Sequence, residues 1–593
     1  MESEVYLGGD AIMKKRIKVQ EAKSNKQVEI PFILALANKI LNILHFVEFI
    51  NNSVEWDPAQ WYVSPGNLAK AVVLATFFDI RSPLSRMSEL YMGIDTEYLF
   101  GEGVKPENIN EYNIAQMLDR LADAKPNKLY GTFCLTAHAV YRIFFKRLHS
   151  DTTSLSFYGS YENNDEEKET DDLLGVGDQK EESSIRIEKG YNKDDRHSCK
   201  QLVYGKIVNE YGIPIAGFSM DGTTSDVTWN KKVIEHLQDS YKEVISGGIY
   251  IADSKMVNAE IVRTLTDPKK PIMFISRCPS NFYGKLENEI IEKAYQADAW
   301  VEIGKVGKGK KACDYSTWEC EMPFEDRTIR LVAVKSSEGR QRFLSKMDKE
   351  LKSLTEEVND VNKKKFACEA DAIMEWDRFR KNNKKELFDC KVTYRETKIE
   401  KRRRGRPAKD AKPVSVETVW NICIEVTGEN GAAVERFRQT EECFVLITNV
   451  SKDKLNMREI LEHYKGQIVV EKDFKFFKEP CIASVIYLKT PERIKALVML
   501  LGVSLLLRGL IQYKMRKGYQ KAIEDNIELP RVGWRSTELQ STLTVNFLMY
   551  AFNKSKFIKN GQNSYIYYIE DKMKPRIVTL LQLMDLEVTD LLE

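Results

Sequence analysis

The sequence predicts an α/β fold in which a mixed β-sheet, interrupted by a large insertion, is flanked by helical regions at both ends. Three patterns support this prediction: helical spacing of apolar residues over 31–150, alternating strand-like and helix-like segments over 154–276, and a buried-type strand at 443–448 beyond a long charged stretch. The 593 residues are 43% hydrophobic and 30% charged, so they are too many for one core and apolar enough for several. We expect about three to five domains.

The first element is a helical N-terminal region. Apolar residues recur three to four positions apart, which places them on one side of each helix; they include Ile33, Leu36, Ile40, Leu41, Leu44, Ile114, Met117, Leu118 and Leu121. No helix-turn-helix pattern is evident in the region.

The second element is the sheet. Strand-like segments at 154–159, 201–208 and 213–220 are followed by a helix-like segment at 227–244, a strand at 249–252, a further helix and a strand at 271–276. The acidic residues 163–172 contain few apolar side chains and predict a solvated loop. This order is typical of a ribonuclease-H-like sheet: three strands, a helix, a strand, a helix and a strand. In such a sheet an antiparallel meander is followed by parallel strands.

The third element is the insertion, after which the sheet resumes. A charged helix at 339–385, mixed strands and a basic linker precede the strand at 443–448, and helices are expected at 456–478 and 496–516. The longest apolar stretch, 496–507, is shorter than the roughly 20 residues of a membrane helix, so we expect no membrane insertion. The expected segments are an N-terminal region (1–145), the two parts of the sheet domain (146–280 and 441–520), the insertion (281–440) and a C-terminal region (521–593).

Net charge and cysteine content exclude some classes of protein. Lys and Arg number 90 against 88 Asp and Glu, a net charge of +2, so any affinity for nucleic acid must come from local clusters of positive charge. The ten cysteines include no C-x-x-C pair and only six histidines accompany them, which argues against a zinc finger or a disulfide framework. This usage fits a reducing cytoplasm.

Two acidic residues lie at the rims of predicted strands. Asp151 is placed at the start of one strand, and Asp253 directly follows the strand at 249–252. Carboxylates at the rims of neighbouring strands can converge on one metal ion. Taken singly, an Asp beside a strand is more often a turn residue or a helix cap.

A third acid, Glu471, lies on the helix predicted at 456–478. On that helix Tyr464, Gln467, Glu471 and Lys478 fall within about 60° of one face. Lys478 would stand about 10 Å along the axis from Glu471, a suitable reach for holding a DNA phosphate. An ordinary amphipathic helix also carries a polar stripe.

The spacing Tyr464-x2-Gln467-x3-Glu471-x6-Lys478 resembles the Y-x2-R-x3-E-x6-K signature of DDE transposases of the insertion-sequence-4 superfamily, with Gln467 in place of the usual Arg. Two further segments resemble its long-chain branch: HSDTTSLSFYG at 149–159, and GYNKDDR at 190–196 running on to Lys200-Gln201. With Ala252-Asp253-Ser254-Lys255, the resemblance spans residues from about 149 to about 480.

The resemblance implies that Asp151, Asp253 and Glu471 bind two Mg²⁺ ions, which Mn²⁺ can replace. Two such ions about 4 Å apart activate water or a DNA 3′-hydroxyl and stabilise the leaving oxygen in phosphoryl transfer, and hard cations need oxygen ligands. It also implies that Tyr464, Gln467 and Lys478 contact DNA. Whether the element is released through hairpin ends is open, because Gln467 replaces a cation.

By the same resemblance, the partners are double-stranded DNA, namely the terminal inverted repeats of a bacterial insertion sequence and its target, and further copies of the chain in a dimer or higher assembly. The expected place is the nucleoid of the bacterial cytoplasm. The N-terminal helices would recognise the repeats or, equally, form a dimerisation domain. The alternatives are a catalytically silent DNA-binding protein and a structure-specific nuclease on the same sheet.

A basic segment in the insertion is a second candidate for DNA binding. Arg402, Arg403, Arg404 and Arg406, followed by Pro407, resemble an AT-hook, whose Arg-Gly-Arg-Pro core lies in the minor groove of A·T-rich DNA. A solvated basic linker is the alternative.

Overall fold

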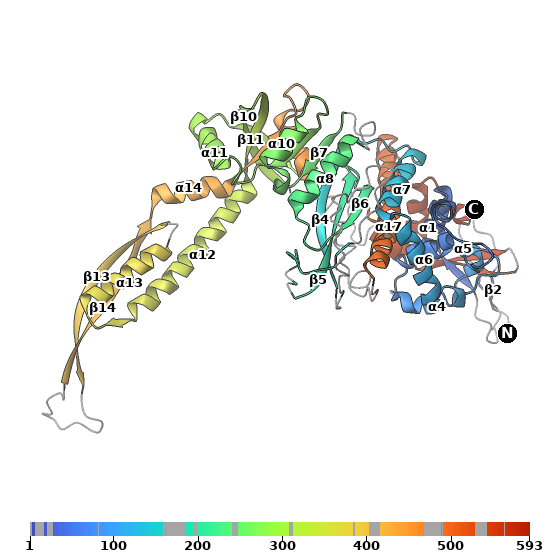
Figure 1. Ribbon diagram of the computed structural model, residues 1–593, viewed down its shortest axis with the longest axis horizontal. Helices are drawn as coiled ribbons and strands as arrows, with labels where there is room; N and C mark the ends of the chain where they lie inside the picture. The colour runs from blue at the N-terminus through green and yellow to red at the C-terminus, as the bar shows by residue number, and fades with distance from the viewer. Residues whose placement is uncertain are drawn as a thin grey trace. The chain divides into compact units, whose positions relative to one another are not determined.

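The computed structural model describes residues 3–5, 17–19, 28–80, 82–157, 161, 185–194, 196, 198–239, 247–307, 312–383, 386–401, 415–467, 488, 490–527, 543–561 and 564–592. The chain divides into two compact units (Figure 1). Unit 1 comprises residues 1–256, 260–274 and 466–593, and unit 2 comprises residues 257–259 and 275–465. The five expected segments follow other boundaries and stay a prediction.

Helices from both ends of the chain build the core of unit 1. The predicted N-terminal helices are present as α1 (Phe32–Ile43), α2 (Phe46–Ser53), α3 (Pro65–Ala75), α4 (Met87–Leu90), α5 (Thr96–Phe100), α6 (Glu111–Asp123) and α7 (Pro126–Val140). Ser64 caps α3 by accepting a hydrogen bond from Asn67 N at 3.2 Å, and Pro65 follows it as the first helical residue. These helices share one apolar cluster with α17 (Pro491–Glu524), α18 (Val545–Phe552) and α19 (Lys574–Gln582).

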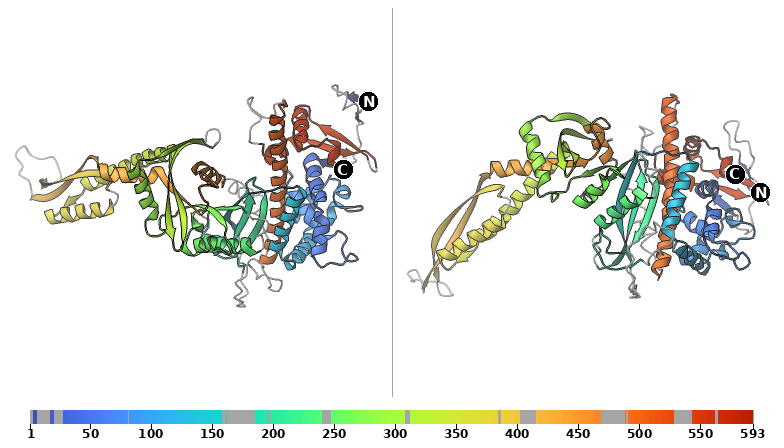
Figure 2. Two further views of the ribbon diagram at one scale, coloured as in Figure 1. Left: turned by 90° about the horizontal axis from the view of Figure 1, so that it is seen from above. Right: turned by 45° about the horizontal axis from the view of Figure 1, so that its top comes forward.

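Helix α17 is the central element of this core, and it packs against α3, α6 and α7 (Figure 2). It extends the predicted helix at 496–516 at both ends. Among the described residues it is the one single helix long and apolar enough to cross a membrane, and α1 with α2 would pass that test only as a pair bent by 56°. However, 94% of its most apolar stretch is buried inside the protein, as in a core helix.

A sheet with the predicted order of elements forms the rest of unit 1. Its strands are β4 (Arg147–Phe157), β5 (Lys200–Asn209), β6 (Pro214–Met220), β7 (Ile249–Ala252) and β8 (Met273–Arg277). Their spatial order is β6-β5-β4-β7-β8. The last three residues of β8 belong to unit 2. β4, β5 and β6 are antiparallel, and β7 is parallel to β4. α8 (Asp226–Asp239) and α10 (Ala259–Leu265) connect β6 to β7 and β7 to β8.

The sheet of unit 1 is covered on both faces, as strands this apolar require. α7 and α17 contact β6, and α8 contacts β4. Every residue of β6 and β7 is buried. The two ends of the chain add a smaller sheet, β3 (Glu29–Pro31), β16 (Ser555–Lys559) and β17 (Tyr565–Ile569), and β1 (Ser3–Val5) pairs with β2 (Ile17–Val19).

Unit 2 contains further strands, which pair onward from β8, and an extended hairpin. β15 (Cys443–Thr448), the strand predicted at 443–448, pairs with β8 and with β11 (Arg327–Ser336), followed by β10 (Cys313–Phe324) and β9 (Val301–Val306). The hairpin consists of β13 (Phe388–Lys401) and β14 (Ser415–Glu429), with the short β12 (Lys365–Phe366) beside β14. α12 (Ser337–Asn362) runs along the hairpin, as Figure 1 shows. α11 (Leu286–Ala297), α13 (Glu369–Asn382), α14 (Gly431–Glu442) and α15 (Met457–Lys465) complete the unit.

Three predicted elements differ from the structure. The charged helix expected at 339–385 is two helices, α12 and α13, because Lys365 and Phe366 leave the helix to pair with Asn421 and Trp420 of β14. The strand expected from residue 154 begins at Arg147, so Asp151 lies inside β4 rather than at its start. One unbroken helix over 456–478 is wrong, since α15 ends at Lys465 and residues 466–467 form a turn; Gly466 is a residue that commonly ends a helix.

Candidate active site

Asp151 lies on β4, and Asp253 directly follows the neighbouring strand β7. In the parallel pair β4–β7, His149 lies opposite Ile251, and each acid is two residues further along its own strand direction. Because side chains alternate along a strand, a step of two residues keeps Asp151 on the sheet face of His149. The register thus brings together two acids that are about a hundred residues apart in the sequence.

Helix α8 is fixed to both strands that carry these acids. Trp229 Nε1 donates a hydrogen bond to Ser150 Oγ on β4 at 3.0 Å, and Tyr250 OH on β7 donates to Asn230 Oδ1 at 2.9 Å. The indole of Trp229 lies against Gly205 of β5, where a Cβ atom would come within 2.8 Å of the ring. Gly205 therefore permits the close packing that positions the start of α8.

The start of α8 brings a third acid, Asp226, to the same place. Thr152 Oγ1, next to Asp151 on β4, donates a hydrogen bond to Asp226 Oδ1. The ammonium of Lys193 lies 3.0 Å from Asp226 Oδ1 and 3.8 Å from Asp151 Oδ1. The side chains of Asp151, Lys193 and Asp226 are each about a quarter exposed, at 24%, 27% and 23%. Neither Asp226 nor Lys193 was predicted as a site residue.

Lys193 is held there by the segment around residues 190–194. Asn192 is buried and donates through Nδ2 to Ser156 Oγ on β4 at 3.0 Å. Gly190 packs so tightly against Gly222 that a Cβ atom would lie 2.2 Å from the Gly222 carbonyl oxygen. Gln201 Nε2 donates to that same oxygen at 2.6 Å and to Tyr191 O at 3.1 Å. These contacts attach the segment to both ends of the meander.

Burial and mutual repulsion make the ionised acids unfavourable. Burial, with the charges of Asp253 and Asp226, raises the pKa of Asp151 to about 6, although Lys193 and the Thr152 amide oppose the change. Burial and the charge of Asp226 also raise the pKa of Asp253, against the Lys255 amide and the charges of Lys193 and Lys255. A half-buried group of repelling carboxylates is an environment in which a divalent cation would be favourable.

These acids fit a metal site only in part. Carboxylate oxygens are suitable ligands for Mg²⁺ or Mn²⁺. Over the part of the chain that the structure describes, however, no three His, Cys, Asp or Glu side chains are close enough together to hold an ion. Asp151 and Asp253 would therefore need a further ligand from another segment.

The other predicted site residues are placed as follows. Glu471 and Lys478 lie outside the described residues, as do Arg402, Arg403, Arg404 and Arg406. Tyr464 is on α15 in unit 2, half-buried, with its ring centroid 6.3 Å from that of Phe444. Gln467 is in the turn after α15 and belongs to unit 1. Their predicted roles are therefore not tested by this geometry.

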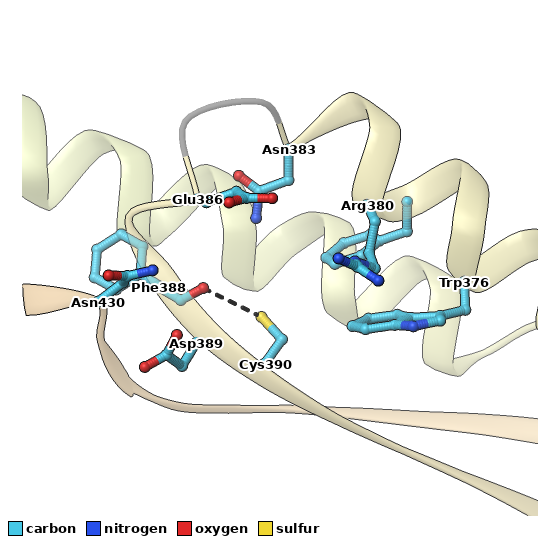
Figure 3. A pocket seen from close by; sticks show the side chains of 9 residues that line it. Trp376, Arg380, Asn383, Glu386, Phe388, Asp389, Cys390 and Asn430 are labelled. Atoms are coloured by element: carbon cyan, nitrogen blue, oxygen red, sulfur yellow. Dashed lines mark hydrogen bonds between the residues drawn. The ribbon is translucent and has the colours of Figure 1, made fainter. Parts of the chain in front are cut away.

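A hollow in unit 2 lies where α13 meets the base of the hairpin (Figure 3). Its lining mixes the stacked rings of Trp376 and Phe379 with Arg380, Glu386 and Asp389. It includes none of the predicted site residues, and the charges of its lining are of both signs. We therefore assign the candidate site to the acids of unit 1.

Comparison with known proteins adds limited information. The domain family described as "Domain of unknown function (DUF4277)" matches residues 26–135. No curated protein matches the sequence. A solved structure described as "Cryo-EM structure of piggyBac transposase synaptic complex with hairpin DNA" is similar at 9% identity and a TM-score of 0.32, over 86% of this chain and 90% of that one. A likeness of this size leaves the assignment of function to the site itself.

Proposed function

We propose that this protein is a DNA transposase that cuts and rejoins DNA strands with Mg²⁺ ions bound by Asp151, Asp253 and Glu471. The observation that carries the proposal is the parallel pairing of β4 and β7, which brings Asp151 on β4 near Asp253, the residue that follows β7. Burial and neighbouring acids raise the pKa of both. Glu471 would supply the ligand that the described residues lack.

The resemblance to DDE transposases gains support from where its separate segments lie. The segment at 149–159 covers most of β4, the segment at 190–196 packs on β4 through Asn192, and Asp253 follows β7. The fold thus brings these three segments together around one pair of acids. The meeting of three such segments therefore favours a shared role.

The order of strands supports a ribonuclease-H-like catalytic domain. In unit 1 the spatial order is third, second, first, fourth and fifth along the chain, with a helix between the third and fourth strands and between the fourth and fifth. In such a sheet the first and fourth strands are neighbours, and here Asp151 lies on the first and Asp253 directly follows the fourth. The insertion of residues 281–440 would then separate Glu471 from the other acids in sequence.

The proposed reaction needs no protein nucleophile. Mg²⁺, when bound, would activate the attacking oxygen and stabilise the leaving oxygen. Asp151 and Asp253 would hold their side chains at fixed positions, because Thr152 N donates to Asp151 Oδ1 at 2.7 Å and Lys255 N donates to Asp253 Oδ1 at 3.0 Å. Water would release a 3′-hydroxyl, which would then attack a phosphodiester of the target.

The proposal includes DNA contacts outside the acids. Tyr464, Gln467 and Lys478 would contact the cut end, and the basic residues 402–406 would lie along the DNA. The substrates would be the terminal repeats of a bacterial insertion sequence and its target, paired by a dimer or higher assembly in the cytoplasm. The cutting and joining steps themselves would take place at Asp151, Asp253 and Glu471.

Substitution of the three acids tests the proposal. Asp151→Asn, Asp253→Asn and Glu471→Gln should each keep DNA binding and lose cleavage by at least about a hundredfold, because each removes a metal ligand. Cleavage and joining are measured with Mg²⁺ and a labelled DNA fragment bearing the element ends. Glu235→Gln, an exposed acid on α8, is the matched control and should keep the wild-type rate.

The same assay separates the alternatives. Binding without any cleavage by the wild-type protein would indicate a silent DNA-binding protein. Cleavage without joined products on a target plasmid would indicate a structure-specific nuclease. A variant of one acid that cleaves at nearly the wild-type rate would remove that acid from the site.

A further inference from the structure

The ammonium of Lys193 lies among oxygen atoms at the candidate site. Its Nζ donates to Thr152 Oγ1 at 2.7 Å and to Thr152 O at 3.1 Å, and it pairs with Asp226 Oδ1 at 3.0 Å. These three contacts use all three donors of an ammonium group. Asp151 Oδ1, at 3.8 Å, is then close enough for attraction between charges but is not a hydrogen-bond partner.

Asp226 has two contacts that hold it toward Lys193 and Thr152. Its Oδ1 accepts hydrogen bonds from Thr152 Oγ1 and faces the Lys193 ammonium. Its backbone is fixed as well, since Asn230 Nδ2 donates to Asp226 O at 2.7 Å within the first turn of α8. Oδ1 of Asp226 is thus directed at Lys193 and Thr152.

The charged residues around Asp151 are held in position by different parts of the structure. Lys206 lies directly opposite Asp151 on β5 and is fully buried, so its position is set by the β4–β5 pairing. Asp253 follows β7. Lys193 is carried instead by the segment around residues 190–194, which is attached through Asn192 and Gly190. The distance of the Lys193 ammonium from Asp151 is therefore set by side-chain contacts, with Thr152 and with Asp226, and not by strand pairing.

We propose that Lys193 competes with divalent metal for Asp151, and that Asp226 is a positioning residue that holds Lys193 away from Asp151 rather than a metal ligand. The inference rests on the proposed metal site. A cation near a carboxylate lowers the affinity of that carboxylate for a second cation. With Asp226 in place the Lys193 ammonium stays at 3.8 Å from Asp151 Oδ1, and Asp151 remains open to metal.

The test is the affinity of the full-length, DNA-free protein for Mn²⁺, followed by the electron paramagnetic resonance signal of the free ion. Lys193→Met should bind Mn²⁺ roughly 1.5- to fivefold more tightly than wild type, the range that a partly exposed ion pair is worth. Asp226→Asn should bind it more weakly by a similar factor, because the freed ammonium moves toward Asp151. Asp226→Asn should weaken Mn²⁺ binding less in the Lys193→Met background than in wild type, because only the direct attraction of the Asp226 charge for the ion is lost there.

Matched variants show that these changes are local. Lys189→Met removes an exposed lysine four residues before Lys193, and Glu235→Gln removes an exposed acid from α8. Both variants should keep the wild-type affinity for Mn²⁺. Lys193→Arg keeps a positive charge and should stay within about twofold of wild type. Thermal unfolding of each variant identifies any that fail to fold, in which case Lys193→Gln replaces Lys193→Met.

The outcomes separate this inference from the proposed function. Unchanged affinity in Lys193→Met, beside weakened affinity in Asp151→Asn and Asp253→Asn, would refute competition while leaving the metal site in place. A double variant weaker than Lys193→Met by the factor seen for Asp226→Asn would make Asp226 a metal ligand and refute its positioning role. An affinity for Mn²⁺ that neither Asp151→Asn nor Asp253→Asn changes would refute the proposed metal site itself.

Discussion

Lys70 shows how one buried charge sets a dependence of stability on pH. Its side chain is 5% exposed on α3, with Nζ 5.9 Å from the centroid of the Phe100 ring. Burial lowers the pKa of Lys70 from 10.5 to about 8, although the charge of Glu48 opposes this. The unfolded chain therefore holds this proton more tightly, so the free energy of unfolding rises as pH increases from about 8 to about 10.5.

Lys70→Met should accordingly stabilise the protein near neutral pH by about 3 kcal/mol, and most of this gain should be lost near pH 10. The measurement is urea unfolding of wild type and variant at the two pH values. Lys105→Met, which removes an exposed lysine, is the control and should change little at either pH. A gain that is equal at both pH values would show that packing, and not the charge, is responsible.

Single residues of the site differ in how far the sequence could identify them. Asp151 and Asp253 were candidates because the first lies in a recognisable strand and the second directly follows one, and the pairing of those strands brings the acids together. Asp226 was not, because an Asp in the first turn of a helix is an ordinary helix-stabilising residue. Lys193 was part of a resembling segment, but its ion pair with Asp226 depends on a tertiary contact that no spacing encodes.

At the scale of elements, the sequence pattern predicts the bounds of some apolar strands correctly but not the ends of the helices. β7 and β15 have the predicted bounds because a run of buried side chains ends sharply at polar residues. The division between α12 and α13 was missed, since charged helical spacing continues through Lys363 and Lys364 and only pairing with β14 removes Lys365 and Phe366 from the helix. Local pattern fixes the type of such elements, and tertiary pairing fixes their limits.

The junction of α12 and α14 gives a prediction at this scale. Gly339, in the first turn of α12, packs so closely on α14 that a Cβ atom would lie 2.7 Å from Glu442 O and 2.8 Å from Glu442 Cα. Gly339→Ala should lower the free energy of unfolding by about 1 kcal/mol or more, because the backbone of α12 or α14 must move to admit the methyl group. This cost should exceed the gain from the higher helix propensity of alanine. The measurement is thermal unfolding followed by circular dichroism.

Gly431, the first residue of α14, is the matched control. No atom lies within 4 Å of a Cβ placed there, so Gly431→Ala should be neutral or stabilise by up to about 1 kcal/mol. If both variants unfolded at the wild-type temperature, the junction would have room for a side chain and the close contact would not constrain α12.

At the scale of the whole molecule, the two ends of the chain complete one core within unit 1. Ile30 of β3 pairs with Phe557 of β16, and the ring centroids of Phe32 and Phe557 are 4.5 Å apart. Tyr98 OH also donates to Leu592 O at 2.9 Å. The sequence predicts helices at both ends, but it holds no signal for contacts across more than 450 residues. An N-terminal segment that ends near residue 145 is therefore hard to separate from the rest of unit 1.

We expect that residues 1–145 alone do not fold, even though the family match at 26–135 lies within them. Phe32, Ile33 and Leu34 are fully buried, and without α17, α18 and β16 they would be exposed to water. Expressed alone, the fragment should be insoluble or show no cooperative thermal transition. Co-expression with residues 490–593 should restore solubility and resistance to limited proteolysis, because that fragment supplies the missing side of the core. A cooperative transition from residues 1–145 alone would instead identify an independent domain.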